Sequence, residues 1–196
     1  MALRTKSEGA VDTLVRYTVG LDTADSQQLR SAFTSDAILD LTKFSKLGMD
    51  IPIVQGREAI VQACMHSVGI PLDTTHSLSS FQFLPGADDD QLRIRCYAEA
   101  QHFRKDQGLM QTAKDHYWSK SIYEALLTCQ AGVWRINHLA IEPLWSIGNV
   151  AGFVRASFRS VTRTAAVNAC LPHWFDTTSE THCDNGVSGS KLYKAT

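Results

Sequence analysis

The stretch RCYAEAQHFRKDQG (residues 95–108) alternates like a β-strand and ends near a titratable ring. Side chains two apart share a face of a strand, so Cys96, Ala98, Ala100 and His102 lie together. A strand that only filled a core would carry Val, Ile or Leu there, whereas small side chains leave volume that a bound molecule can occupy. The pattern therefore predicts a pocket beside this strand, with His102 at its end.

Long strands on either side extend this pattern. Four β-rich runs are expected, at residues 74–84, 91–105, 114–129 and 132–141. The first two are separated by PGADDD and the last two by QAG, which are turn-forming sequences. Consecutive strands joined by short turns predict an antiparallel meander.

Helical patterns precede the strands instead of alternating with them. A first helix is expected over residues 7–20 with Ser7 as its cap, and a short one starts at Asp25 or Ser26. The short helix is expected to carry Leu29, Ala32 and Phe33, a strand to cover residues 37–41, and a further helix to run through GREAIVQACMHSVG to a stop at Gly69. This order favours an α+β fold, with helices on one face of a curved sheet.

The C-terminal part of the chain changes composition near residue 170. We expect one domain over residues 1–169, including a C-terminal helix within residues 146–169 where basic and apolar positions alternate. Residues 170–196 are polar and are expected to form a flexible tail.

Composition limits the partners. The 196 residues carry a formal net charge of −1, which gives no general electrostatic reason to bind nucleic acid or an anionic membrane surface. No segment has the apolar length of a signal peptide core or a membrane span. The five cysteines are odd in number and form no CxxC pair, which favours reduced thiols and a cytoplasmic location over disulfides or a zinc site.

Motif searches leave acid and base groups as the candidate chemistry. The chain lacks GxGxxG, GxxxxGK[ST], HExxH and GxSxG, so no cofactor and no metal is expected. Titratable and hydroxyl residues instead fall where a curved sheet would open: Asp22, His76, His102, Tyr117, Ser121 and Tyr123. Imidazole can take up a proton at one nitrogen while a carboxylate such as Asp22 orients the other, and hydroxyls can polarise a carbonyl.

Each candidate also has a structural interpretation. A single strand histidine is more often a hydrogen-bonded structural residue, and this is expected for His66, His116, His138, His173 and His182. Asp22 lies in the turn-like LDTAD and fits a helix cap. His76 and His102 are stronger as a pair, because they occupy corresponding ends of adjacent antiparallel strands.

Five segments in order carry a family resemblance: RYTVGLDTADSQQLRSAFTSDAILDL, GREAIVQAC, TTHSLSSFQF, RCYAEAQHFRKDQG and GVWRINHLAIEP. Together they resemble the SnoaL-like branch of the nuclear-transport-factor-2-like superfamily, which includes polyketide cyclases and scytalone dehydratase. The similarity covers about residues 8–146. It implies a cone-shaped α+β barrel, in which helices pack against a strongly curved, mostly antiparallel sheet around a deep pocket.

The resemblance to scytalone dehydratase also implies roles for individual residues. Asp22, His76, His102 and Ser121 match an aspartate, two histidines and a serine of that enzyme's active site, where the imidazoles transfer protons and tyrosines hold a water on the substrate carbonyl. The tyrosine positions correspond to Leu21 and Leu41 here, and a nearby asparagine corresponds to Tyr123. Tyr17, Tyr117 and Tyr123 are therefore the expected substitutes, and Leu41 is expected to contact the substrate.

With this resemblance, the residues predict a cofactor-independent enzyme of the SnoaL-like class, a dehydratase, isomerase or cyclase acting on a small polyketide- or terpenoid-derived carbonyl compound. His102 is expected to be the base, with Asp22 fixing its tautomer. His76 is expected to be the acid, with Ser121 or Tyr123 donating a hydrogen bond to the same oxygen.

Two other functions stay open from the sequence. One is a non-catalytic ligand-binding or dimerisation module of the same fold. The other is epoxide hydrolysis, which needs paired carboxylates with an arginine, and its candidates scatter over both strand faces: Asp40, Glu99, Asp115, Arg95 and Arg104. A homo-oligomer, dimer or trimer, is expected from the aromatic content of HYWSKSIYEALL.

Overall fold

The structure is a computed structural model that describes residues 5–105 and 116–148. The helices are α1 (Lys6–Asp22), α2 (Ser26–Ser31), the 3-10 helix η1 (Thr42–Leu47), α3 (Arg57–Cys64) and the π-helix η2 (Met65–Gly69). The strands are β1 (Phe33–Asp40), β2 (Val54–Gln55), β3 (Leu72–Pro85), β4 (Gln91–Arg104), β5 (His116–Gln130) and β6 (Val133–Gly148). The expected α+β class is confirmed.

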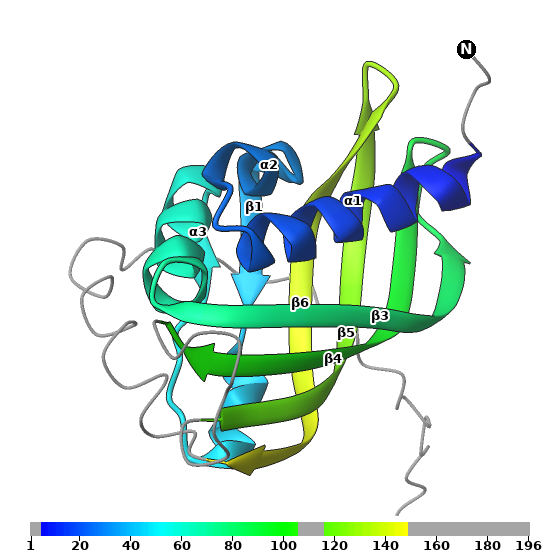
Figure 1. Cartoon of the computed structure of the whole chain (residues 1–196). Helices are drawn as coiled ribbons and strands as arrows, with labels where there is room; N and C mark the ends of the chain where they lie inside the picture. The colour runs from blue at the N-terminus through cyan, green and yellow to red at the C-terminus, as the bar shows by residue number, and fades with distance from the viewer. Residues whose placement is uncertain (1–4, 106–115, 149–196) are drawn as a thin grey trace, which may run out of the picture. The chain divides into compact units, whose positions relative to one another are not determined.

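The strands form one six-stranded sheet in the order β2-β1-β6-β5-β4-β3. β3 to β6 make the expected antiparallel meander, whereas β1 pairs in parallel with β6. The sheet bends so strongly that β3 runs horizontally in Figure 1 while most of β6 runs vertically. Because β2 and β3 end the order without pairing to each other, the sheet is curved but not closed.

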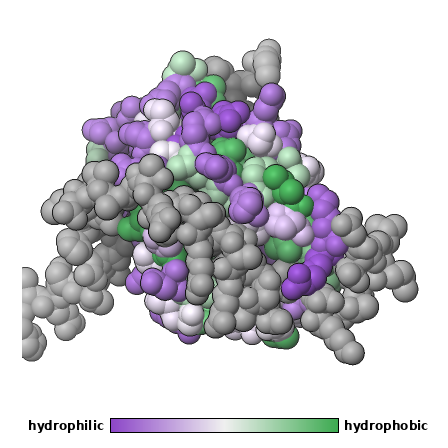
Figure 2. All heavy atoms as spheres, turned by 90° about the vertical axis from the view of Figure 1, so that its left-hand side faces the viewer, coloured by the Kyte–Doolittle hydropathy of each residue, from purple (hydrophilic) through white to green (hydrophobic). Residues whose placement is uncertain are grey.

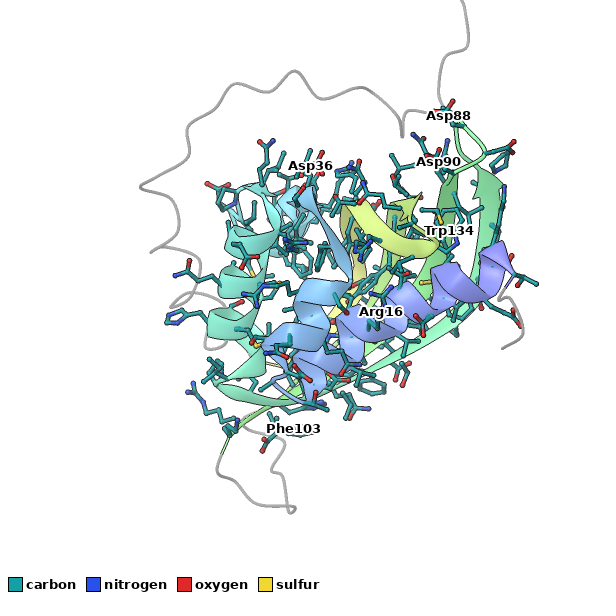
Figure 3. The ribbon with its side chains drawn as sticks, turned by 90° about the horizontal axis from the view of Figure 1, so that it is seen from above. Arg16, Asp36, Asp88, Asp90, Phe103 and Trp134 are labelled. Atoms are coloured by element: carbon teal, nitrogen blue, oxygen red, sulfur yellow. The ribbon has the colours of Figure 1, made fainter. Side chains whose placement is uncertain are left out.

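Helix α1 lies across the concave side of the sheet (Figure 1). Its N-cap is Thr5, in a capping box with Glu8, and not Ser7 as expected; the Thr5 side chain accepts the hydrogen bond of the Glu8 backbone amide. Arg16 joins the helix to the sheet, because its guanidinium donates to the backbone carbonyl of Trp134 at 2.7 Å. Figure 3 shows these two residues near each other where α1 passes over the sheet.

The second helix and the first strand differ from the sequence prediction at their boundary. Asp25 caps α2 as expected, since its side chain accepts from the backbone amides of Gln27 and Gln28. The helix ends at Ser31, however, and Phe33 already belongs to β1, where it pairs with Ile136. Leu29, Ala32 and Phe33 have the spacing of an apolar helix face, but the backbone of Phe33 pairs in parallel with β6 and belongs to the sheet.

Helices α3 and η2 form one wall beside the sheet. Their expected end at Gly69 is confirmed, and the last turn widens to a π-helix over residues 65–69. Ile60, Val61, Ala63 and Cys64 are buried, while Gln62 and His66 are exposed. Figure 2 shows the side of the molecule that carries this wall, where hydrophilic residues surround smaller hydrophobic areas.

Strand β6 is longer than predicted. It continues to Gly148, because Ser146, Ile147 and Gly148 pair with Ser119, Trp118 and Tyr117 of β5. The C-terminal helix expected within residues 146–169 is therefore wrong for its first three residues, and the rest of it lies outside the described part of the chain. The domain boundary at residue 169 and the tail over residues 170–196 lie outside it too and stay predictions.

The core lies between the helices and the concave face of the sheet. Residues that are fully or almost fully buried come from α1, α2, β1, α3 and β6: Leu14, Leu29, Phe33, Ile60 and Ile136. Tyr17 packs edge-on against Phe33. Of the helices in the described ranges, none is both long and apolar enough to cross a membrane.

Gly20 tests how tightly α1 and α2 pack. Replacing glycine by alanine in a helix usually stabilises it by about 1 kcal/mol. A Cβ on Gly20 would lie 2.7 Å from the backbone nitrogen of Leu29, and backbone cannot yield as a flexible side chain does. Gly20→Ala is therefore expected to lower the free energy of unfolding by about 1–3 kcal/mol, measured by urea denaturation.

Val15→Ala is the control, because Val15 is exposed on the same helix. Its expected change is small. A Gly20→Ala protein more stable than the wild type would contradict the close approach of the two helices.

Candidate active site

A cavity of about 110 Å³ opens between the concave face of the sheet and the helices. Its apolar lining comes from most of the elements around it: Leu21, Leu39, Leu41, Phe44, Ile51, Val68, Leu72, Ala98, Ala100 and Ile141. Its polar lining is Tyr17, Cys64, Ser67, His76, His102, Tyr117, Ser119, Ser121 and Tyr123. The volume is enough for several water molecules or part of a small organic ligand.

The cavity exists because small residues face each other across β4 and β5. Ala98 is opposite Ser121, and Ala100 is opposite Ser119. All four line the cavity and are nearly fully buried. The pocket predicted from the small face of residues 96–102 is thus confirmed for Ala98, Ala100 and His102, whereas Cys96 lies in the packed core.

The two histidines meet at this hollow from adjacent strands. His76 pairs with Ala100 and Thr74 pairs with His102, so the imidazoles are diagonal neighbours on one face. Their ring centroids are 5.5 Å apart and the rings are almost perpendicular. The expected placement of both rings at one cavity is confirmed.

Asp22, the last residue of α1, is bound to His76 through both carboxylate oxygens. Oδ1 lies 2.6 Å from Nδ1 of the imidazole, and Oδ2 accepts the His76 backbone N–H at 2.9 Å. The side chains are 4% exposed for His76 and 19% for Asp22. The carboxylate therefore fixes the orientation of the ring. Nε2 is the ring nitrogen that Asp22 does not bind.

This pairing corrects the sequence prediction, which placed Asp22 against His102. The C-terminus of α1 lies over β3, so its last carboxylate reaches the edge strand and not β4 one strand further in. Asp22 does not cap α2, since Asp25 does.

His102 lies in a very different environment. It is 8% exposed, and its Nδ1 is buried with no hydrogen-bond partner among the residues described. Burial is the main cause that lowers its pKa from 6.5 to about 3; the nearby His76 ring lowers it further, and the backbone of Tyr117 acts in the opposite direction. His102 is therefore an uncharged imidazole at neutral pH. Because Nδ1 is shielded, a molecule in the cavity reaches this ring only through Nε2 or its carbon atoms.

Three tyrosines line the cavity as expected from the resemblance. Tyr17 and Tyr123 face each other with ring centroids 6.2 Å apart, and burial raises the pKa of both hydroxyls. Neither hydroxyl hydrogen-bonds another group within the described residues. Burial also raises the pKa of the Tyr117 hydroxyl, and the nearby side chains of Ser119 and Ser146 act in the opposite direction. Tyr17 and Tyr123 therefore present hydroxyl donors to a ligand in the cavity.

Other lining residues were expected in part. Ser121 and Leu41 lie at the cavity as predicted. The sequence analysis missed Ser119, although it shares a strand face with Ser121 two residues away. It also missed Phe44 of η1 and Ser67 of η2, because only the tertiary arrangement brings these helices to the cavity. Cys64 lines it as a protonated thiol, since burial raises its pKa to about 12.

The described residues considered for epoxide hydrolysis do not line the cavity. Asp40, Glu99, Arg95 and Arg104 are not among the cavity's lining residues. Glu99 accepts from the indole of Trp118 and pairs with Lys120, and Arg95 pairs with Glu124. Asp115 lies outside the described residues. Within those residues, His, Cys, Asp and Glu side chains do not gather in groups of three or more that could hold a metal ion.

Comparison with known proteins identifies the family. The model of the SnoaL-like domain matches residues 6–140, so the chain belongs to this family. A curated relative, terrestric acid biosynthesis cluster protein E of Penicillium crustosum, is 28% identical over 148 residues, which cover 74% of this chain and 88% of the relative.

Solved structures share the fold. A Novosphingobium aromaticivorans protein proposed to be a scytalone dehydratase matches with a TM-score of 0.59 at 14% identity, over 72% of this chain and 86% of its own. The hexachlorocyclohexane dehydrochlorinase LinA-type3 of Novosphingobium barchaimii LL02 matches with a TM-score of 0.58 at 13% identity, over 74% and 90%. At these identities the similarity shows the cone fold alone, which agrees with the resemblance found in the sequence.

The buried His102 makes stability depend on pH. An unfolded histidine titrates near pH 6.5, whereas folded His102 titrates near 3, so between these values the unfolded chain binds one proton more. Stability contributed by this group is full above pH 6.5 and is lost as the pH falls, by about 1.4 kcal/mol per pH unit at most. His102→Asn is expected to flatten the slope of unfolding free energy between pH 6.5 and 4.5, measured by urea denaturation at each pH.

Some slope will remain, because burial also lowers the pKa of His138. His66→Asn is the matched control, since His66 is exposed, and it should leave the slope unchanged. Equal slopes in wild type and His102→Asn would show that His102 is not held uncharged by the fold.

Proposed function

We propose that this chain is an acid/base enzyme, a dehydratase, isomerase or cyclase, acting on a small polyketide- or terpenoid-derived carbonyl compound in natural-product biosynthesis. One observation carries the proposal: a carboxylate-bound histidine and an uncharged histidine lie side by side in a mostly apolar cavity. The name of the Penicillium relative, a biosynthesis cluster protein, supports the pathway class.

The contacts favour His76 as the group that takes up the proton. When Nε2 of His76 removes a proton α to a carbonyl, the imidazolium charge is met at 2.6 Å by the Asp22 carboxylate. Among the described residues, no carboxylate is bonded to His102, and burial opposes its protonation. The roles expected from the sequence are therefore exchanged in this proposal: His76 is the base, and His102 stays uncharged as a hydrogen-bonding partner.

The carbonyl oxygen gains negative charge as the α-proton leaves. The hydroxyls of Tyr17 and Tyr123 stay protonated, because burial raises the pKa of both. They are suited to donate hydrogen bonds to that oxygen, and such donors act most strongly in a cavity with few waters. Ser121 is a further donor in the cavity.

A dehydration on this site balances with one proton shuttle. His76 accepts the α-proton, the electron pair of the broken C–H bond forms the new double bond, and the C–O bond of a β-hydroxyl breaks. The imidazolium then gives its proton to the departing oxygen, which leaves as water. For an isomerisation, the same proton returns to a different carbon or oxygen.

Solvent deuterium exchange tests the proton transfer before the full reaction is known. Carbonyl compounds with α-protons are incubated with the protein in D₂O, and loss of the α-proton signal is followed by NMR. His76→Asn is expected to slow the catalysed exchange by about 10²-fold or more, while circular dichroism shows the fold intact.

The matched control is His66→Asn, which changes an exposed histidine of η2 and should exchange like wild type. Wild-type exchange rates in His76→Asn, with a good substrate, would contradict the proposal. Tight binding without exchange for any compound would instead favour the non-catalytic ligand-binding module.

Asp22→Asn separates charge from geometry. An amide oxygen can still accept the His76 backbone N–H, but it no longer neutralises an imidazolium. Exchange is expected to fall about 10-fold to 100-fold, whereas Asp25→Asn, at the exposed cap of α2, should have no effect on exchange. Unchanged exchange in Asp22→Asn would show that the carboxylate does not assist the base.

The dimeric or trimeric state and the cytoplasmic location expected from the sequence stay predictions. The same holds for the small-molecule substrate as the main partner.

A further inference from the structure

The charges around the cavity restrict the charge of the ligand that it can bind. This inference rests on the proposed function and specifies its substrate class. Among the described residues, the lining consists of apolar side chains and hydrogen-bonding groups that are neutral or matched by Asp22. Asp22 itself stands behind His76, with both oxygens occupied by that residue. When His76 is protonated, the pair has no net charge; when it is not, the pair is negative.

The raised pKa values of Tyr17 and Tyr123 indicate that a negative charge is unfavourable in the cavity. Burial is the main cause of the raised pKa of Tyr17 and Tyr123; neighbouring tyrosine and cysteine side chains raise it further, and Asp22 makes a smaller contribution to both. A negative oxygen at either hydroxyl is therefore disfavoured by the loss of water and by repulsion from the carboxylate. A ligand carboxylate at the same place meets the same two penalties, because a buried charge without a partner is costly.

The hydrogen-bonding groups of the cavity indicate which uncharged ligand groups it can bind. Tyr17 and Tyr123 supply hydroxyl donors that suit a carbonyl oxygen. At the hollow lined by Ala98 and Ala100, Nδ1 of His76 is bonded to Asp22, so Nε2 is the His76 nitrogen that a ligand can reach, and His102 contributes an uncharged ring beside it. A hydroxyl group satisfies an imidazole nitrogen of either tautomer, because it both donates and accepts.

We propose that the ligand of this cavity is an uncharged compound carrying a carbonyl group and a nearby hydroxyl, and that the corresponding free acids are excluded. In a biosynthetic sequence the enzyme then acts on ketones, lactones, esters or amides. Any carboxylate must be masked before this step or released after it.

A matched pair of probes tests the exclusion. Salicylamide and salicylate have the same ring and the same hydroxyl beside a carbonyl group, but only salicylate is a carboxylate at pH 7. Isothermal titration of the full chain is expected to show salicylamide binding at least ten times more tightly. Equal or tighter binding of salicylate would overturn the proposal, and so would failure of both probes to bind at millimolar concentration, because salicylamide has every required group.

Two variants locate and explain the effect. Ala100→Leu fills the hollow opposite Ser119 and beside His76, and it should abolish binding of salicylamide; retained binding would place the probe elsewhere and overturn the assignment. Leu41→Lys adds a cation to the lining and should reduce the preference for salicylamide by at least tenfold. An unchanged preference would contradict the electrostatic explanation.

The outcome is separate from that of the proposed function. A preference for salicylate would leave proton transfer by His76 possible on an anionic substrate. Wild-type deuterium exchange in His76→Asn would remove the acid/base mechanism, while the preference of the cavity for neutral ligands would stand.

Discussion

The contact between Asp22 and His76 is the constraint on which the site depends. It joins the last residue of α1 to the edge strand β3 through two hydrogen bonds, at 2.6 Å to the ring and 2.9 Å to the backbone. The ring bond fixes one imidazole nitrogen and orients the other. The backbone bond ties the strand itself to the helix, so the helix that covers the core also positions the histidine. Packing and chemistry are coupled at this one residue.

The cavity beside that contact exists because the inner face of the sheet carries small side chains. The inner faces of β3, β4 and β5 line one cavity, and larger apolar residues at those positions would fill it. Ala98, Ala100, Ser119 and Ser121 do not. His102 is buried beside this cavity and stays uncharged, because among the described residues no carboxylate compensates its loss of water. The two histidines thus acquire different properties from their neighbours.

The sequence was sufficient for the parts of this arrangement that depend on local periodicity. Alternation along residues 91–105 predicted β4, its inner face and the position of His102, and the turn sequences predicted the meander. The helical spacing that wrongly carried α2 to Phe33 shows the limit, because the parallel pairing with β6 comes from a segment about 100 residues away in the sequence. The predicted partner of Asp22, His102, was wrong for the same reason. Spacing places a carboxylate at the end of α1, but only packing determines which strand lies beneath it. The η1 segment carries no signal that would have assigned Phe44 to the cavity.

Asp22 also limits the chemistry that it supports. Burial makes a negative charge beside Tyr17 and Tyr123 costly, and the Asp22 carboxylate that would stabilise an imidazolium adds a smaller repulsion. An enolate next to these hydroxyls is therefore tolerated only while the proton remains close by on His76, when the pair and the substrate together carry one negative charge, as they did before transfer. Charge is redistributed within the cavity and is not increased by the reaction. A short proton shuttle between neighbouring atoms keeps the two opposite charges close together, so the hydrogen bond at the end of α1 would stabilise the proposed reaction as well as the fold.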